Sequence, residues 1–143
     1  MRDLLIGGAI SLINFGIHAV MTALIVVTTR RTKTRTHHSG IFVRLTALLT
    51  VTVTILMLAH ILEIAIWAAV IDGLGIKIAN AGPFEYAFEN YTALGYGDAL
   101  PTDSGYRLIG PVMALNGLLL IGWSVAVIFE VMRMAEFEVH RSK

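Results

Sequence analysis

The chain has 143 residues, of which 56% are hydrophobic and 15% are charged, and its net charge is +1. The mean hydropathy of +0.74 means more apolar surface than a soluble domain of this length can bury, so the class is integral membrane protein. The absence of cysteine excludes disulfides and thiolate metal sites. We expect the lipid bilayer, and no nucleic acid, as a partner.

Three apolar segments are long enough to cross a bilayer, because about 20 apolar residues span its hydrocarbon core. They cover residues 4–29, 41–71 and 108–132. The first is too long for a signal peptide and no small-residue cleavage site follows it, so we expect it to remain as a transmembrane helix. The whole chain, 1–143, is predicted to be a single membrane domain.

The first segment carries one stripe of small and polar residues at helical spacing, which we expect to pack on protein. Its members are Gly7, Ser11, Asn14, His18 and Thr22. Asn14 is predicted to reach the depth of His60 in the second segment and to form a hydrogen bond with it. A role of His18 as a proton site is a further possibility.

Basic residues without any acid fill the link between the first two segments: Arg30, Arg31, Lys33, Arg35 and Arg44. Because cytoplasmic loops carry such an excess, the link is predicted to be cytoplasmic, the N-terminus outside and the C-terminus cytoplasmic. The protein is thus expected to cross the plasma (inner) membrane several times. Contact with lipid headgroups is the alternative role of these charges.

The second segment places His60 and Glu63 on one helical face. Ionisable groups inside a membrane usually face protein. We favour an internal hydrogen-bonded brace against the segment that follows, through Asn90, Tyr86 or Tyr91. A pH-sensitive pair and a metal or haem site remain as alternatives.

Between the second and third segments, the sequence predicts a short helix that enters the membrane and turns back. Gly82-Pro83 is a favourable start, since proline at the first helical position loses no needed hydrogen bond. Glu85 in the first turn suits the positive end of the helix. The helix is expected to end near Thr92, and Pro101 closes the segment. Non-helical backbone at this depth must be buried in protein or line a watery cavity.

Residues 92–98 read Thr-Ala-Leu-Gly-Tyr-Gly-Asp. Glycines around a tyrosine allow backbone conformations that other residues avoid, and carbonyl oxygens aimed at one axis can replace the water around a cation. The stretch from Phe84 to Phe129 resembles the pore helix, selectivity filter and inner helix of small prokaryotic-type pore-loop potassium channels. By this resemblance, 41–71 is the outer helix, 83–98 the pore helix and filter, 108–132 the inner helix, and 4–29 an additional N-terminal helix.

The resemblance implies that K+ binds to the main-chain carbonyls of Ala93, Leu94, Gly95 and Tyr96. The complete filter that it implies also includes residues on either side of these four: Thr92 and Gly97. Because each chain has one such loop and coordination needs a ring of them, the resemblance implies a homotetramer. No cofactor other than the permeant ion is expected.

Two filter residues depart from the family pattern Thr-Val-Gly-Tyr-Gly. Ala93 replaces the threonine whose hydroxyl helps to form the innermost ion site, and Leu94 replaces valine. We expect the preference for potassium to survive because Gly-Tyr-Gly is intact. A weakly selective channel for monovalent cations is the alternative.

Other positions take roles by the same resemblance. Glu89 and Asp98 are expected to support the filter by sharing a hydrogen bond or a proton, since two neighbouring carboxyls do not both ionise readily; an exposed surface acid is the alternative for Glu89. Gly117 and Gly122 stand at positions of gating glycines, with close helix packing as the alternative.

Spacings of three and four residues place one apolar set on a single helical face: Leu118, Ile121, Val125 and Phe129. By the resemblance this face lines the cavity below the filter, and Phe129 is the candidate for a hydrophobic gate. We therefore expect an all-α membrane protein with three transmembrane helices, a re-entrant pore helix and a filter loop, assembled as a homotetrameric channel and not an enzyme. A non-conducting subunit or a redox protein that uses His18, His60 and Glu63 remains the alternative.

Overall fold

The computed structural model describes residues 2–35 and 40–141, and for 32–35 and 135–141 it describes the backbone only. The chain forms four α-helices, α1 (Arg2–Arg35), α2 (Ile41–Gly73), α3 (Pro83–Tyr91) and α4 (Ile109–Arg141), and a 3-10 turn, η1 (Ser104–Tyr106). The side chains of Lys33, Arg35 and Arg141, which contribute to the predicted charge pattern, lie outside the described residues.

Three helices are long and apolar enough to cross a membrane, over Arg2–Arg31, Ile41–Gly73 and Ser104–Met134. The predicted transmembrane helices are thereby confirmed, each a few residues longer than expected. The fourth helix, α3, is short and lies between two of the long ones in the chain, as predicted. The protein is an all-α membrane protein.

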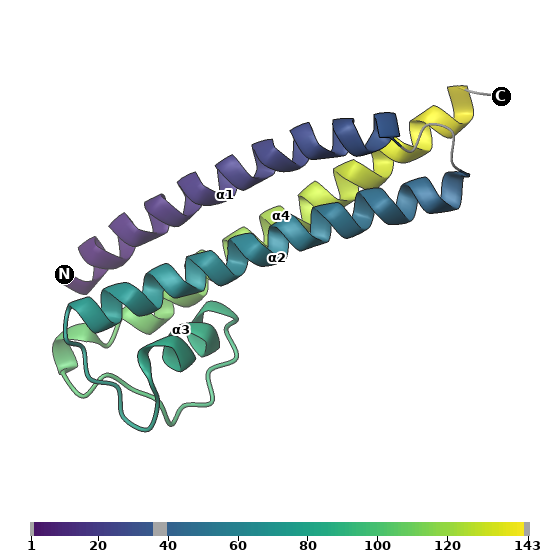
Figure 1. Ribbon diagram of the computed structural model, residues 1–143. Coiled ribbons are helices and arrows are strands. Elements are labelled where there is room, and N and C mark those ends of the chain that lie inside the picture. Colours follow the sequence, from purple (N-terminus) through teal and green to yellow (C-terminus); the bar gives the residue numbers. More distant parts are fainter. Residues whose placement is uncertain (1, 36–39, 142–143) are drawn as a thin grey trace.

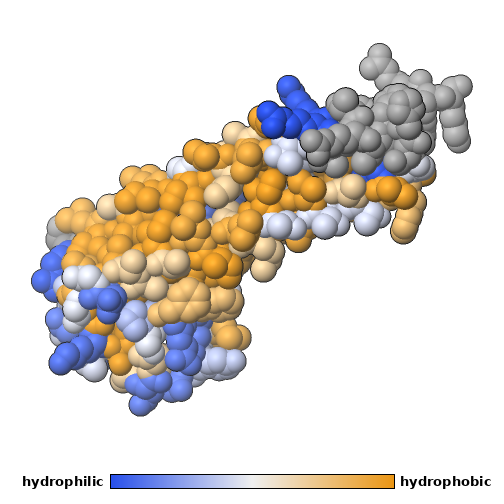
Figure 2. Space-filling model, in the orientation of Figure 1, coloured by the Kyte–Doolittle hydropathy of each residue, from blue (hydrophilic) through white to orange (hydrophobic). Residues whose placement is uncertain are grey.

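The helices are arranged so that α2 and α4 separate α1 from α3 (Figure 1). The N-terminal end of α1 lies at the same end of the molecule as α3, and the C-terminal end of α4 lies at the opposite end. Hydrophobic side chains cover most of the visible face of the long helices, whereas hydrophilic ones gather around the α3 end and, in a smaller group, near the opposite end (Figure 2). This polarity is expected of a segment that faces water at one membrane surface.

The start of α1 is held against the start of α4. The Asp3 carboxylate accepts a hydrogen bond from the Leu108 backbone N–H at 3.2 Å, and the Arg2 guanidinium lies 4.5 Å from the centre of the Tyr106 ring. Asp3 is only 5% exposed. The additional helix is therefore anchored to the pore-side connection as well as packed along α2 and α4.

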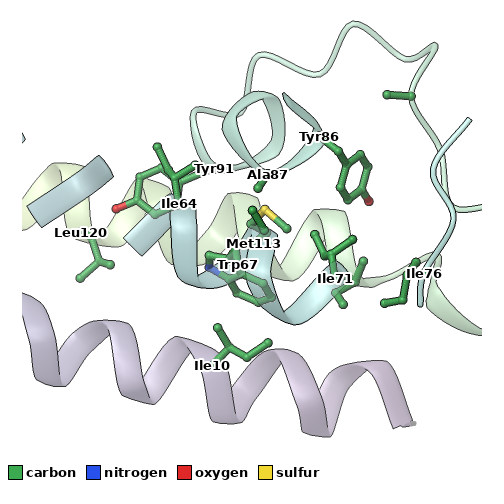
Figure 3. Packing of buried hydrophobic residues seen from close by; sticks show 13 residues of the cluster. Ile10, Ile64, Trp67, Ile71, Ile76, Tyr86, Ala87, Tyr91, Met113 and Leu120 are labelled. Atoms are coloured by element: carbon green, nitrogen blue, oxygen red, sulfur yellow. The ribbon is translucent and has the colours of Figure 1, made fainter. Parts of the chain in front are cut away.

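The larger hydrophobic core lies between α1 and α3 (Figure 3). Trp67 of α2 is completely buried there, with Ile10 of α1 on one side and Met113 of α4 nearby. Tyr86 and Tyr91 bring α3 into the same cluster. A smaller cluster at the far end joins the other halves of the long helices: Ile25, Leu48, Leu56 and Val131.

Helix α3 begins and ends where the sequence predicts, to within one residue. Gly82 precedes it and Pro83 occupies its first position. At the other end, the N–H of Ala93 donates to the Asn90 carbonyl and the N–H of Leu94 donates to the Glu89 carbonyl, both at 2.9 Å. These two bonds and the positive φ of Ala93, 55°, form a Schellman-type cap that ends the helix.

Candidate functional site: the filter loop and its support

The loop after α3 has an alternating backbone. Ala93, Gly95 and Gly97 have positive φ angles of 55°, 51° and 85°, and the residues between them do not. Where left-handed and right-handed backbone conformations alternate from residue to residue, successive peptide groups point toward the same side. In an extended strand they point to opposite sides. Glycine adopts the left-handed region without strain, so two of the three positions suit their residues. This is the geometry expected of a row of carbonyl groups.

Residues 92–98 are all exposed in the single chain. The hydroxyl of Thr92 turns back to α3 and donates to the Phe88 carbonyl at 2.9 Å. At the far end of the loop, the Asn80 side chain donates to the Asp98 carbonyl at 3.1 Å. The loop is thus held at both ends by its own chain, and its middle is free to contact other molecules.

Two glycines of α4 allow α3 to approach very closely. A Cβ added to Gly117 would lie 1.9 Å from the carbonyl oxygen of Tyr91, and one added to Gly110 would lie 2.6 Å from Asn90 Oδ1. By contrast, no described atom lies within 4 Å of such a Cβ at Gly122. The structure supports the packing role for Gly117, and Gly110 is a contact that the sequence reasoning missed.

Glu89 is buried, with 9% of its surface exposed, so the alternative of a surface acid is wrong. Burial raises the pKa of this carboxyl, and the charges of Asp98 and Glu85 raise it further. The charge of Asp98 is thus near enough to act on the Glu89 carboxyl. A shared hydrogen bond or proton between Glu89 and Asp98 remains a prediction.

The face predicted to line the cavity is open in the single chain. Leu118, Val125 and Phe129 are 54%, 63% and 66% exposed, and Ile121 between them is half-buried. Large apolar side chains exposed in a row on one helix indicate a surface that meets other protein or a pore.

One known protein family matches a continuous segment that holds both the loop after α3 and most of α4. A family model described as "Ion channel" matches residues 82–134. This part of the chain carries an ion channel domain. Searches of curated proteins and of solved structures gave no match. The family favours ion conduction over enzymatic catalysis, and the matched residues cover α3, the filter loop and most of α4.

Behind the pore helix of this channel lies a buried polar cluster. His18 of α1 and Glu63 of α2 are fully buried, with His18 Nδ1 2.8 Å from Glu63 Oε1. The Tyr91 hydroxyl of α3 donates to Glu63 Oε2 and lies 2.7 Å from His60 Nδ1. Ser124 Oγ of α4 lies 2.9 Å from His60 Nε2 and 3.3 Å from His18 Nε2.

This cluster supports the predicted brace and corrects part of it. The brace runs through Tyr91, whereas Asn90 instead donates to the Tyr86 carbonyl at 2.9 Å. The predicted bond between Asn14 and His60 is wrong: Asn14 donates to Asn116 Oδ1 at 3.1 Å and faces the Glu63 carbonyl at 3.4 Å. The reason is helix register, because His18, one turn further along α1, lies at the depth expected for Asn14.

Two neighbours of the cluster were missed from the sequence. Ser124 joins the two histidines, and the Trp123 ring packs against His18 with their centres 5.4 Å apart. One signal was available, since Ser124 follows Gly117 and Leu120 at spacings of three and four on the face of α4 that is buried.

One ligand atom each from His18, His60 and Glu63 lies within 4.8 Å of the others. That spacing is short enough for a small cation. However, both ring nitrogens of both histidines already have hydrogen-bond partners within the cluster. The arrangement is complete as a hydrogen-bonded network, so we describe it as one.

Proposed function

We propose that the channel is potassium-selective and that four copies of the chain surround one pore. Dehydrated K+ ions pass along the main-chain carbonyls of Ala93, Leu94, Gly95 and Tyr96, with Thr92 and Gly97 completing the filter. No other cofactor takes part. The observation that carries the proposal is the alternating φ pattern at residues 93, 95 and 97, within a loop that is fully exposed in the single chain.

Cyclic assembly follows from the need for a ring of oxygens, and the resemblance to potassium channels sets the number of chains at four. One loop offers carbonyls from a single side, and a desolvated cation needs them from all sides. A closed cyclic homo-oligomer supplies identical loops around an axis. The open apolar row of Leu118, Val125 and Phe129 supports the same arrangement, with Phe129 as a hydrophobic gate and Gly122 as the hinge that remains free of close contacts.

In the membrane, the filter end of the molecule faces outward and the C-terminus faces the cytoplasm. The basic residues Arg30 and Arg44 line a cavity at the end opposite to α3, which supports a cytoplasmic position for that end under the positive-inside rule. The plasma (inner) membrane is the location that this orientation implies.

A weakly selective channel for monovalent cations is the second candidate, and a specific residue favours it. Ala93 has no hydroxyl, so the innermost site offers fewer oxygens than a threonine would provide. Whether cavity size or carbonyl field sets selectivity is debated.

Flux into liposomes that contain only the purified chain tests the proposal. We expect potassium uptake with sodium strongly excluded, and a loss of about tenfold in Gly95→Ala, because a left-handed non-glycine residue is disfavoured by roughly 1–2 kcal/mol. Ala93→Thr restores the hydroxyl and is expected to sharpen selectivity. Equal permeation of sodium and potassium in bi-ionic measurements would select the weakly selective channel.

The same preparation tests whether the chain conducts without a partner and whether it carries a redox group. A chain that reaches the bilayer but passes no ions by itself would be a non-conducting subunit that needs a partner pore. Metal analysis and a visible absorption spectrum of the purified protein test for a redox protein. Chemical cross-linking in the bilayer, with the largest species expected at four chains, tests the assembly.

A further inference from the structure

The polar cluster behind the pore helix is a closed ring. In order around it stand His18, Glu63, Tyr91, His60 and Ser124. Each contacts the next: His18 Nδ1 and Glu63 Oε1 at 2.8 Å, Glu63 Oε2 and the Tyr91 hydroxyl, that hydroxyl and His60 Nδ1 at 2.7 Å, His60 Nε2 and Ser124 Oγ at 2.9 Å, and Ser124 Oγ and His18 Nε2 at 3.3 Å.

A hydrogen bond needs one proton between its two heavy atoms. The five contacts around the ring therefore need five protons. A sixth contact crosses the ring, from His60 Nδ1 to Glu63 Oε2 at 3.2 Å, and it needs no further proton because a proton on His60 Nδ1 serves both Tyr91 and Glu63. Each neutral histidine brings one ring proton, and Tyr91 and Ser124 bring one hydroxyl proton each, whereas an ionised Glu63 brings none. The ordinary forms of these side chains thus supply only four protons, and one contact would set two lone pairs against each other.

We propose that this ring is a proton-binding site that holds a fifth proton at neutral pH. Two arrangements of the five protons give every contact around the ring one proton. In one, Glu63 is a carboxylic acid, and every member donates one bond and accepts one. In the other, Glu63 is a carboxylate and one of the two histidines is an imidazolium. Both distributions have zero net charge.

The buried position of the ring favours a net charge of zero. His18 and Glu63 are fully inaccessible to solvent, and a buried charge without compensation is strongly disfavoured in an apolar interior. Four protons would leave the ring with a net charge of −1. The titratable members are His18 from α1, His60 and Glu63 from α2, and Tyr91 from α3, while Ser124 of α4 does not titrate.

The ring has one member or more from each of the four α-helices. Tyr91 is the last residue of α3, directly before the filter loop, and its carbonyl lies against Gly117 of α4. Removal of the fifth proton breaks one bond of the ring and leaves a charge next to Tyr91. The site therefore couples the protonation of side chains on α1 and α2 to the support that Tyr91 gives to the filter loop.

Nitrogen-15 NMR of histidine-labelled protein in lipid bilayers counts the ring protons directly. The other histidines of the chain, His37, His38 and His140, are replaced by glutamine so that only His18 and His60 report. At pH 7 we expect three of their four ring nitrogens to carry a proton, or two together with a carboxylic acid band in the infrared spectrum that disappears in Glu63→Gln. Two neutral histidines with an ionised Glu63 would overturn the proposal.

Ser124 gives a matched pair of variants. Ser124→Ala opens the ring and leaves three contacts, for which the histidines and Tyr91 supply three protons, so only the neutrality of the site still holds the extra proton. We expect that proton to leave at a lower pH than in the native chain. Ser124→Thr keeps a hydroxyl and is expected to release the proton at the same pH as the native chain. Release at the same pH in both variants would show that closure of the ring does not hold the proton. Stoichiometric Zn2+ binding to the native bilayer-embedded protein, with loss of the ring protons, would also overturn the assignment.

Flux then tests the coupling, and this arm rests on the proposed function. Potassium flux should fall at the alkaline pH where NMR shows the fifth proton leaving, and the fall should occur at lower pH in Ser124→Ala than in Ser124→Thr. Flux that is unchanged while the proton leaves would overturn the coupling. A preparation without flux at any pH would contradict the proposed function and leave the proton count standing.

Discussion

The pore helix and the filter loop are adjacent in the chain but differ completely in their surroundings. Tyr86, Ala87 and Tyr91 of α3 are 2% exposed or less, and the loop that begins at Thr92 is exposed throughout. A single chain therefore completes the support of the filter and leaves the filter itself open. The buried side of this boundary stabilises the fold, and the exposed side is where we propose that ions pass.

The close contact of Gly117 with Tyr91 lies on the buried side, and its disruption should give the largest loss of stability. In Gly117→Ala, the new Cβ meets a backbone oxygen at 1.9 Å, and backbone atoms yield much less than a flexible side chain. We expect a loss of about 3 kcal/mol in the free energy of unfolding. Thermal unfolding in detergent, followed by circular dichroism, measures it.

Gly122→Ala is the matched control on the same helix, because no described atom lies within 4 Å of its added Cβ. Alanine favours a helix over glycine by about 1 kcal/mol, so this variant should be as stable as the native chain or slightly more stable. Equal losses of unfolding free energy in Gly117→Ala and Gly122→Ala would show that the close approach of α3 to α4 is not what destabilises Gly117→Ala.

The next effect concerns the hydroxyl of Tyr91. Tyr91→Phe keeps the buried ring and removes the partner of Glu63 and His60, which leaves buried polar atoms unpaired. We expect a loss of about 1–3 kcal/mol, measured by the same unfolding experiment. Tyr106→Phe is the control, since its ring over Arg2 is retained. A Tyr91→Phe variant as stable as the control would exclude the brace.

A smaller effect should appear as a dependence of stability on pH. The pKa of Glu89 is raised, first by burial and then by Asp98 and Glu85, so the folded chain binds the proton more tightly than the unfolded chain. Stability is then highest at acidic pH and falls as pH rises from the ordinary glutamate value, about 4.3, through the raised pKa. Glu89→Gln should not show this decline. A parallel decline in both proteins would assign it to other groups.

The smallest effect on stability is expected at Ala93, where α3 gives way to the exposed loop. Ala93 has a φ of 55°, which disfavours a residue with a side chain by about 1 kcal/mol. Ala93→Gly is expected to regain part of this energy and to raise the midpoint of thermal unfolding slightly. Ala87→Gly, inside α3, should lower it, because glycine weakens a helix interior. An Ala93→Gly variant that unfolds at lower temperature would contradict the left-handed conformation.

The sequence was sufficient for the features that depend on local chemistry. The lengths of the apolar segments, Pro83 at the start of α3 and the special backbone conformations of Gly95 and Gly97 all depend on nearby atoms, and each was predicted correctly. The stripe from Gly7 to Thr22 faces protein as expected, since Asn14 and His18 are fully buried. Helical spacing alone was enough to find that face.

Features that depend on the relative position of two helices were not predictable in the same way. A shift of one turn along α1 exchanges Asn14 for His18 opposite His60, and the sequence contains no measure of that shift. Gly110 and Ser124 were missed for a similar reason. Their roles arise from how closely α3 and α2 approach α4, and that distance depends on the whole core.

The hydrogen-bonded ring also has a consequence for the order of synthesis. His18, His60 and Glu63 belong to the first two helices, whereas Tyr91 and Ser124 follow later in the chain. Because synthesis runs from the N-terminus, His18 is available to Glu63 before Tyr91 and Ser124 have been made. The 2.8 Å contact between His18 Nδ1 and Glu63 Oε1 is therefore the one contact around the ring that needs only the first two helices.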